Sequence, residues 1–423
     1  MLSRVPRTGG PVTQTLSLDA NLGAGYDDNV AGDTTSGNAD PTSMRSGTAA
    51  TLDGGLQYVR GNARHSLRLD SRGMAYHYPD YLSDPVAGVS VVAGLRTTVG
   101  RSTALDGSQT FGSEPFFSAF APAANVSTPT LATQQAIPIT GLFERRSRHA
   151  RTSVSVAQPL GARHSLSAGY TYGTRQFSDD QVGDNSSHAT NTGYAVAVSD
   201  ALRLRGDYQY TTFDLRAEDS LAAPQTDRTH RVEGGLDLQL ASRGDRPLTL
   251  MAVAGAARLE STGATDAAVP GATAWVPVAT AGLGVPLGAT WSIEASYRRE
   301  FSLLQGISTQ LFSNDASSLS LRGALTRRTA VQVGATLGDW RVPNQSGRPE
   351  RFRVYGVNLQ VRQMLNNVLG LTAGYTYYQH RLADLETLPL GFPSEYGRRA
   401  VRIGLSLRLP LIGPRPAQAS VTR

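Results

Sequence analysis

The stretch Gly161–Tyr172, which reads Gly-Ala-Arg-His-Ser-Leu-Ser-Ala-Gly-Tyr-Thr-Tyr, contains the pattern that decides the fold. After a short polar turn, every second residue is apolar, and the residues between them are small or polar. A period of two is typical of a β-strand with two unlike faces. The same pattern recurs at 202–210, 291–297 and 369–377, and each copy follows a turn and ends in tyrosine. Strands of about ten residues with aromatic residues at one end are typical of transmembrane β-barrels.

The composition favours one continuous architecture. The chain has 423 residues, yet no linker or change of composition divides it. Its hydrophobic fraction is 40% and its mean hydropathy is −0.25. These average values are compatible with a membrane barrel, because apolar lipid-facing residues and polar lumen-facing residues alternate along each strand. The uncharged run 272–291 contains two prolines and three glycines, which indicates strand, turn and strand and argues against a spanning helix.

We therefore predict an all-β fold, a transmembrane antiparallel up-and-down β-barrel of about 18 strands with short periplasmic turns and long extracellular loops. The barrel is expected over 12–410, between an N-terminal periplasmic segment at 1–11 and a C-terminal tail at 411–423. The predicted strands cover about 16–26, 47–59, 67–78, 89–99, 103–111, 148–158, 164–177, 188–199, 201–213, 229–241, 247–259, 272–285, 290–302, 315–325, 329–340, 352–363, 367–380 and 397–409.

Connections between these strands alternate in length, which is a second signal for a membrane barrel. The longest, at 112–147, loses the period of two and is rich in proline and phenylalanine. We expect it to fold inward as a constriction or plug, or else to remain unstructured. The third strand changes parity, with Leu69 on the apolar face early and Tyr76 later, so we predict a β-bulge near Ser71–Gly73.

A soluble solenoid or propeller is the competing fold. It shares the alternation of apolar and polar residues, but its repeats have one fixed period, whereas the strand spacing here varies. Glycine and tyrosine dominate the apolar face, which favours the membrane barrel.

The first strand and its exit, Leu16–Val30, resemble the opening of the β-barrel porin family found with bacterial exopolysaccharide and exosortase loci. The shared feature is a glycine-rich strand that ends in the Tyr-Asp-Asp-Asn phrase Tyr26–Asn29. The resemblance implies a porin-like channel in the outer membrane of a Gram-negative bacterium, serving polysaccharide export. The sequence departs from the usual pattern because Pro410–Arg423 follows the last strand in place of a terminal aromatic signal. No secretory signal is visible at the start, so we expect that the native leader is missing.

Residues of the opposite parity are expected to face the lumen, where charges need water or partners. One interpretation is a structural network of ion pairs, and the other is a charged constriction that sets selectivity. Arginine outnumbers the carboxylates and the net charge is +6, which favours anionic solutes. The predicted pore-lining residues are Arg203, Arg205, Asp207, Arg231, Glu233, Asp237, Glu294, Arg298, Glu300, Arg322, Arg362 and Arg402.

Charged groups also collect at the two ends of the barrel. Asp/Asn clusters at Tyr26–Asn29, 178–185 and 214–219 are interpreted as turn chemistry, with a calcium site as the alternative. Arginines at the short turns either solubilise the periplasmic edge or dock an acidic partner. These arginines are Arg60, Arg64, Arg101, Arg163, Arg243, Arg246, Arg327 and Arg328.

Catalytic function has little support in the sequence. The chain has no cysteine, its seven histidines are scattered without metal-ligand spacing, and no nucleophile elbow, phosphate loop or dinucleotide fingerprint occurs. We therefore expect no enzyme activity, cofactor or metal. Arginines alternate with carboxylates and form no basic stripe, so nucleic acid is not an expected partner.

The predicted function is an outer-membrane channel for an extracellular polysaccharide or anionic solutes. The alternative is a closed structural or surface-display barrel whose loops bind partners. The expected partners are outer-membrane lipid and lipopolysaccharide, together with polysaccharide and periplasmic export components.

Overall fold

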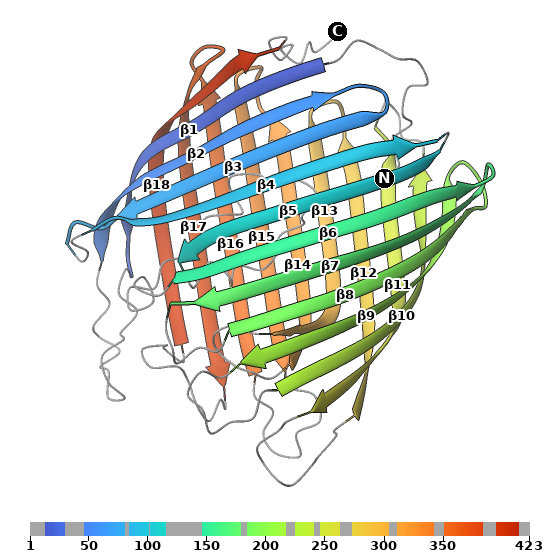
Figure 1. Ribbon diagram of the computed structural model, residues 1–423. Coiled ribbons are helices and arrows are strands. Elements are labelled where there is room, and N and C mark those ends of the chain that lie inside the picture. The colour runs from blue at the N-terminus through green and yellow to red at the C-terminus, as the bar shows by residue number, and fades with distance from the viewer. Residues whose placement is uncertain are drawn as a thin grey trace.

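The chain forms a closed antiparallel β-barrel, with eighteen strands among the residues that the computed structural model describes (Figure 1). Each strand pairs with its neighbours in the sequence, and β1 (Thr13–Asp27) pairs with β18 (Glu395–Ile412) to close the ring. The predicted all-β, up-and-down architecture is confirmed.

The structure describes residues 13–29, 46–80, 84–100, 102–115, 146–178, 184–216, 225–240, 246–262, 273–303, 311–341, 351–383 and 395–413. Within these ranges, no helix is long and apolar enough to cross a membrane. The strands between the first and the last are β2 (Gly47–Gly61), β3 (His65–His77), β4 (Val86–Val99), β5 (Thr103–Pro115), β6 (Arg146–Leu160), β7 (His164–Phe177), β8 (Asp184–Ala197), β9 (Leu202–Arg216), β10 (Gln225–Leu240), β11 (Leu248–Thr262), β12 (Thr273–Leu287), β13 (Trp291–Leu303), β14 (Leu311–Ala324), β15 (Thr329–Arg341), β16 (Arg351–Met364) and β17 (Leu369–Ala383).

Short turns join alternate pairs of strands at one end of the barrel. Between β2 and β3, the Asn62 Oδ1 accepts hydrogen bonds from the backbone amides of Arg64 and His65, at 2.8 and 2.7 Å. Asn366 makes the corresponding contacts between β16 and β17. Gly161, in the turn before β7, has a φ of 82°, in the left-handed region that favours glycine. The order of the strands places the start of β1 and the end of β18 at this same end.

At the opposite end, several strands extend beyond the predicted limits. β14 begins at Leu311 and not at 315, and β17 ends at Ala383 and not at 380. The paired ladder continues there although the outward residues are polar, as where Ser313 faces Arg341. Apolar alternation marks only the lipid-facing length of a strand, so a prediction based on it stops short of the strand end.

The apolar face of the strands is the outer face of the barrel. On β18, Val401, Ile403 and Leu405 are exposed, whereas the alternate residues Ala400 and Ser406 are buried. Most of the other strands expose large apolar or aromatic side chains in the same way. A continuous exposed apolar band around a closed barrel is the surface that lipid chains cover.

Aromatic side chains border this band on the outer wall. The rings of Tyr172 and His188 have centroids 4.7 Å apart, and those of Tyr210 and His230 are 4.8 Å apart. Both pairs join neighbouring strands in the part of the barrel nearer the long connections. Interfacial aromatic residues are typical of transmembrane barrels, so this part of the wall has the predicted girdle.

β3 keeps an unbroken register with both neighbouring strands, so the predicted β-bulge near Ser71–Gly73 is wrong. Leu67 and Leu69 are exposed on the outer face, but Tyr76 and Tyr78, which have the opposite parity, are buried. The apparent change of parity has a simple cause. Large aromatic residues near the end of this strand belong to the interior of the barrel and not to the lipid face.

Candidate functional site in the barrel interior

The predicted pore-lining residues lie on the inward face of their strands, since their parity is opposite to that of exposed residues such as Leu204 and Val232. Arg203 on β9 faces Asp237 on β10 in the register of the two strands. The set comprises Arg203, Arg205 and Asp207 on β9, Arg231, Glu233 and Asp237 on β10, Glu294, Arg298 and Glu300 on β13, Arg322 on β14, Arg362 on β16 and Arg402 on β18.

Two carboxylates face each other on β9 and β10. Asp207 and Glu233 are partners in the strand register, and like charges directly opposite each other destabilise a sheet. Each of them pairs with an arginine two residues away on its own strand. Arg205 lies 3.7 Å from Asp207, and Arg231 lies 2.6 Å from Glu233. The carboxylates are therefore neutralised along the strands and not across them.

An ion-pair chain, which we call the charged arch, connects strands that are not neighbours. It runs from Glu233 through Arg231 and Glu300 to Arg298. The Arg231 Nη1 lies 3.7 Å from the Glu300 Oε2, and the Arg298 Nη1 lies 3.4 Å from the Glu300 Oε1. β11 and β12 separate the two ends of the arch in the sheet. Side chains can span two intervening strands in this way only on the concave inner face of the wall.

The wall beneath the charged arch is made of small and apolar residues. Ala257 faces Arg231 in the register, and Gly255 faces Val278. Ala257 and Val278 are almost completely buried. A Cβ added to Gly255 would lie 1.9 Å from the Val232 carbonyl oxygen, so this position requires glycine. Since these wall residues are apolar, the charged groups above them pair with one another and not with the wall.

Two further inward contacts involve predicted residues. The Arg322 Nη2 donates a hydrogen bond of 3.2 Å to the Glu294 Oε2. The Arg402 guanidinium on β18 lies over the ring of Tyr76 on β3, 5.5 Å from its centroid. β1 and β2 lie between β18 and β3 in the sheet, so the contact of Arg402 with Tyr76 also spans two strands on the inner face of the wall.

A buried group, which we call the seam cluster, lies where the barrel closes and consists of Asp27, Arg398 and Tyr78. The Arg398 Nε donates to the Asp27 Oδ1 at 2.7 Å, and its Nη2 contacts both the Asp27 Oδ2 and, at 2.8 Å, the Tyr78 hydroxyl. The Arg398 and Asp27 side chains are only 3% and 2% exposed. Burial raises the pKa of Tyr78 although the guanidinium opposes the shift, so the hydroxyl stays protonated.

The Tyr-Asp-Asp-Asn motif has a structural role at this seam. The Asp28 carboxylate accepts a 2.6 Å hydrogen bond from the Arg399 backbone amide. The Asn29 side chain donates to the Gly397 carbonyl oxygen at 2.7 Å, and the Tyr396 hydroxyl donates to the Asn29 carbonyl oxygen at 2.7 Å. Together with Asp27, which pairs with Arg398, Asp28 and Asn29 thus hold the beginning of β18.

An inward aromatic row, made of Trp340, Phe352, His380 and Tyr396, crosses β15 to β18. Consecutive ring centroids are 5.1, 5.8 and 5.5 Å apart. All four residues are buried and lie near the ends of the strands that lead to long connections. The sequence pattern does not predict this row, because tyrosine and phenylalanine in an alternating strand are also typical of a lipid-facing surface. The parity that Phe352 shares with Arg362 could have revealed it.

Several predicted features lie wholly or partly outside the described residues. Among the described residues, no group of three or more His, Cys, Asp or Glu side chains is placed to hold a metal ion. At Tyr26–Asn29, the carboxylates instead bind Arg398 and the backbone of Arg399. The features outside the description are 116–145 of the longest loop, 179–183 and 217–219 of the acidic clusters, and Arg101 and Arg243 of the basic rim.

No family model matches the chain, and no curated protein matches it. Among solved structures, the outer membrane protein OpdK from Pseudomonas aeruginosa is similar, with 12% identity, coverage of 93% of this chain and 99% of that chain, and a TM-score of 0.46. OpdO from the same organism has 13% identity, with 95% and 98% coverage and a TM-score of 0.45. The alcaligin outer membrane receptor FauA from Bordetella pertussis has 12% identity, with 94% and 76% coverage and a TM-score of 0.42.

These likenesses concern the fold alone. The location of the chain follows from its own surface, because a closed barrel leaves no strand edge unpaired and its outer band is apolar. Membrane-spanning barrels of this kind, with short turns at one end and long connections at the other, belong to bacterial outer membranes. The chain is a transmembrane β-barrel of the bacterial outer membrane.

Proposed function

We propose that this barrel is an outer-membrane channel whose inward arginines favour anionic solutes. The observation that carries the proposal is the inward charged surface of β9 to β18, in which seven arginines stand against five carboxylates among the predicted pore-lining residues. Rings of charged side chains set the selectivity of pores. A barrel of this strand number is wide enough to enclose an aqueous lumen.

We further propose that the channel serves the export of an extracellular polysaccharide, with periplasmic export components as partners. The support is the resemblance of Leu16–Val30 to barrels associated with exopolysaccharide loci. An excess of inward arginine suits an acidic glycan, because guanidinium groups pair with carboxylates. The proposed activity is transport without catalysis.

The test of channel function is the current through the refolded barrel in a planar bilayer under a salt gradient. We expect stepwise openings and a reversal potential that indicates anion preference. Arg231→Gln should lower that preference, because it removes an inward charge. Arg258→Gln is the matched control, since Arg258 lies on the outer face and pairs with Glu260 at 3.0 Å. Cation preference in the unmodified barrel would refute the proposed selectivity.

A closed structural barrel is the second candidate function, and the charged arch supports it. Ion pairs that bridge β10 and β13 brace the wall whether or not solutes pass. This candidate predicts no current from barrels that are folded and inserted. It also predicts that Arg231→Gln lowers the stability of the barrel and still gives no current.

A further inference from the structure

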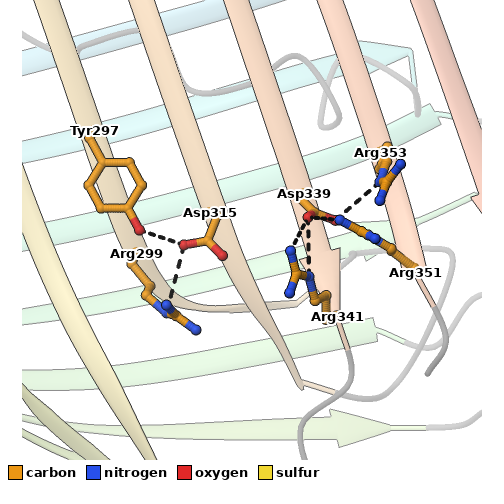
Figure 2. A network of polar contacts seen from close by, with 7 residues as sticks. All are labelled: Tyr297, Arg299, Asp315, Asp339, Arg341, Arg351 and Arg353. Carbon is orange, nitrogen blue, oxygen red and sulfur yellow. Dashed lines mark hydrogen bonds and ion pairs between the residues drawn. The ribbon is translucent and has the colours of Figure 1, made fainter.

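An arginine-rich network lies on the outer wall of β13 to β16, at the end of the strands that leads to long connections (Figure 2). Asp339 is its centre. The Arg341 Nη2 lies 2.5 Å from the Asp339 Oδ2, the Arg351 Nε lies 2.6 Å from its Oδ1, and the Arg353 Nε lies 3.9 Å from the same Oδ1. One carboxylate is therefore shared by three guanidinium groups.

A second carboxylate extends the network toward β13. The Tyr297 hydroxyl donates to the Asp315 Oδ1 at 2.7 Å, and the Arg299 Nε lies 3.7 Å from the same oxygen. Asp315 faces Asp339 in the register of β14 and β15, so the two halves lie side by side in the wall (Figure 2). Four arginines are thus gathered around two aspartates.

The network belongs to the lipid-facing parity. Leu337, two residues before Asp339, and Tyr355, two residues after Arg353, are exposed partners in the register of β15 and β16. Val357 and Leu359 continue the exposed apolar surface toward the short turns. The arginines therefore lie directly above a surface that acyl chains cover, at the level where lipid headgroups begin.

The charge of the network is unbalanced and its arginines remain accessible. The Arg341 and Arg353 side chains are 48% and 39% exposed, whereas Asp339 is 13% exposed. Asp339 thus holds the guanidinium groups in position while their outer edges face the surroundings. Arginine binds phosphate oxygens through paired hydrogen bonds, which an arginine group fixed in this way is prepared to make.

We propose that this network is a binding site for the phosphate groups of a phosphorylated glycolipid in the outer leaflet. The guanidinium groups of Arg341, Arg351 and Arg353 hold the phosphate, and the exposed surface of Leu337 and Tyr355 receives an acyl chain. The site is independent of the lumen, so it does not rest on the proposed channel function. It identifies one side of the barrel, β13 to β16, as the side that retains a bound lipid.

Native mass spectrometry of the refolded barrel, released from micelles that contain lipid A, tests this proposal. We expect a retained lipid A adduct on the unmodified protein and much less retention of lipid A that lacks its phosphates. The double substitution Arg341→Gln and Arg353→Gln should weaken retention by at least about tenfold, since it removes two charged hydrogen-bond donors. The matched control is again Arg258→Gln, which removes one outward arginine elsewhere on the wall and should leave retention unchanged.

Folding of each variant is checked by its heat-modifiable mobility on gels. If the double variant does not fold, the single variant Arg353→Gln takes its place in the comparison with the control. Equal retention of the two lipids, or equal losses in the double variant and the control, would overturn the proposal. Retention that depends on both the phosphates and the two arginines would establish it.

Discussion

At the residue scale, the buried pair of Asp27 and Arg398 leads to a prediction about stability. Asp27→Asn leaves a buried guanidinium without its counter-charge, which typically costs about 3–5 kcal/mol. Asp19→Asn is the control, because Asp19 and Arg408 join the same two strands at 3.6 Å but are 36% and 56% exposed. Loss of such an exposed pair costs about 1 kcal/mol or less. Urea unfolding of the refolded barrels should separate the two variants clearly, and equal midpoints would contradict the assigned role.

The same residues show what the sequence reveals and what it hides. Parity alone assigns Arg231 and Glu300 to the inward face, because each strand alternates strictly. Their contact cannot be predicted in this way, since it depends on the curvature that brings β10 within reach of β13. Asp27 and Arg398 are separated by nearly the whole chain, so their pairing follows only from closure of the barrel.

At the element scale, β3 provides the clearest test of the inward and outward faces. The chain has no cysteine, so Leu69→Cys and Met74→Cys each introduce one unique labelling site. The unbroken register puts Leu69 outside and Met74 inside. A fluorophore at position 69 should be quenched by lipid-chain quenchers, and one at position 74 by water-soluble quenchers. A β-bulge between the two positions would instead place both labels in lipid. Quenching of both labels by lipid-chain quenchers would therefore show that the β-bulge exists.

Strand positions follow well from the sequence, whereas strand ends and some faces do not. Alternation located every strand because lipid imposes an apolar outer face on each of them. Alternation did not predict the ends of strands such as β14 and β17, which continue above the lipid with polar outward residues. It also misassigned Tyr76 and Tyr78, because an aromatic residue suits either a lipid interface or a buried interior.

At the scale of the whole molecule, closure of the barrel means that the chain can begin and end at a different turn without losing a strand pair. Leu16 and Ile412 are partners in the register of β1 and β18, so a short linker can join the two ends at the short-turn edge. A circular permutant opened at the Gly161 turn keeps every strand pair and should refold in detergent to a heat-modifiable barrel. A permutant opened between Gly169 and Tyr170 divides β7 within the wall and should fail to close. Tight exposed turns tolerate new termini, whereas paired strand interiors do not. If both permutants fold equally, the unbroken pairing of β7 with β6 and β8 is not needed for closure.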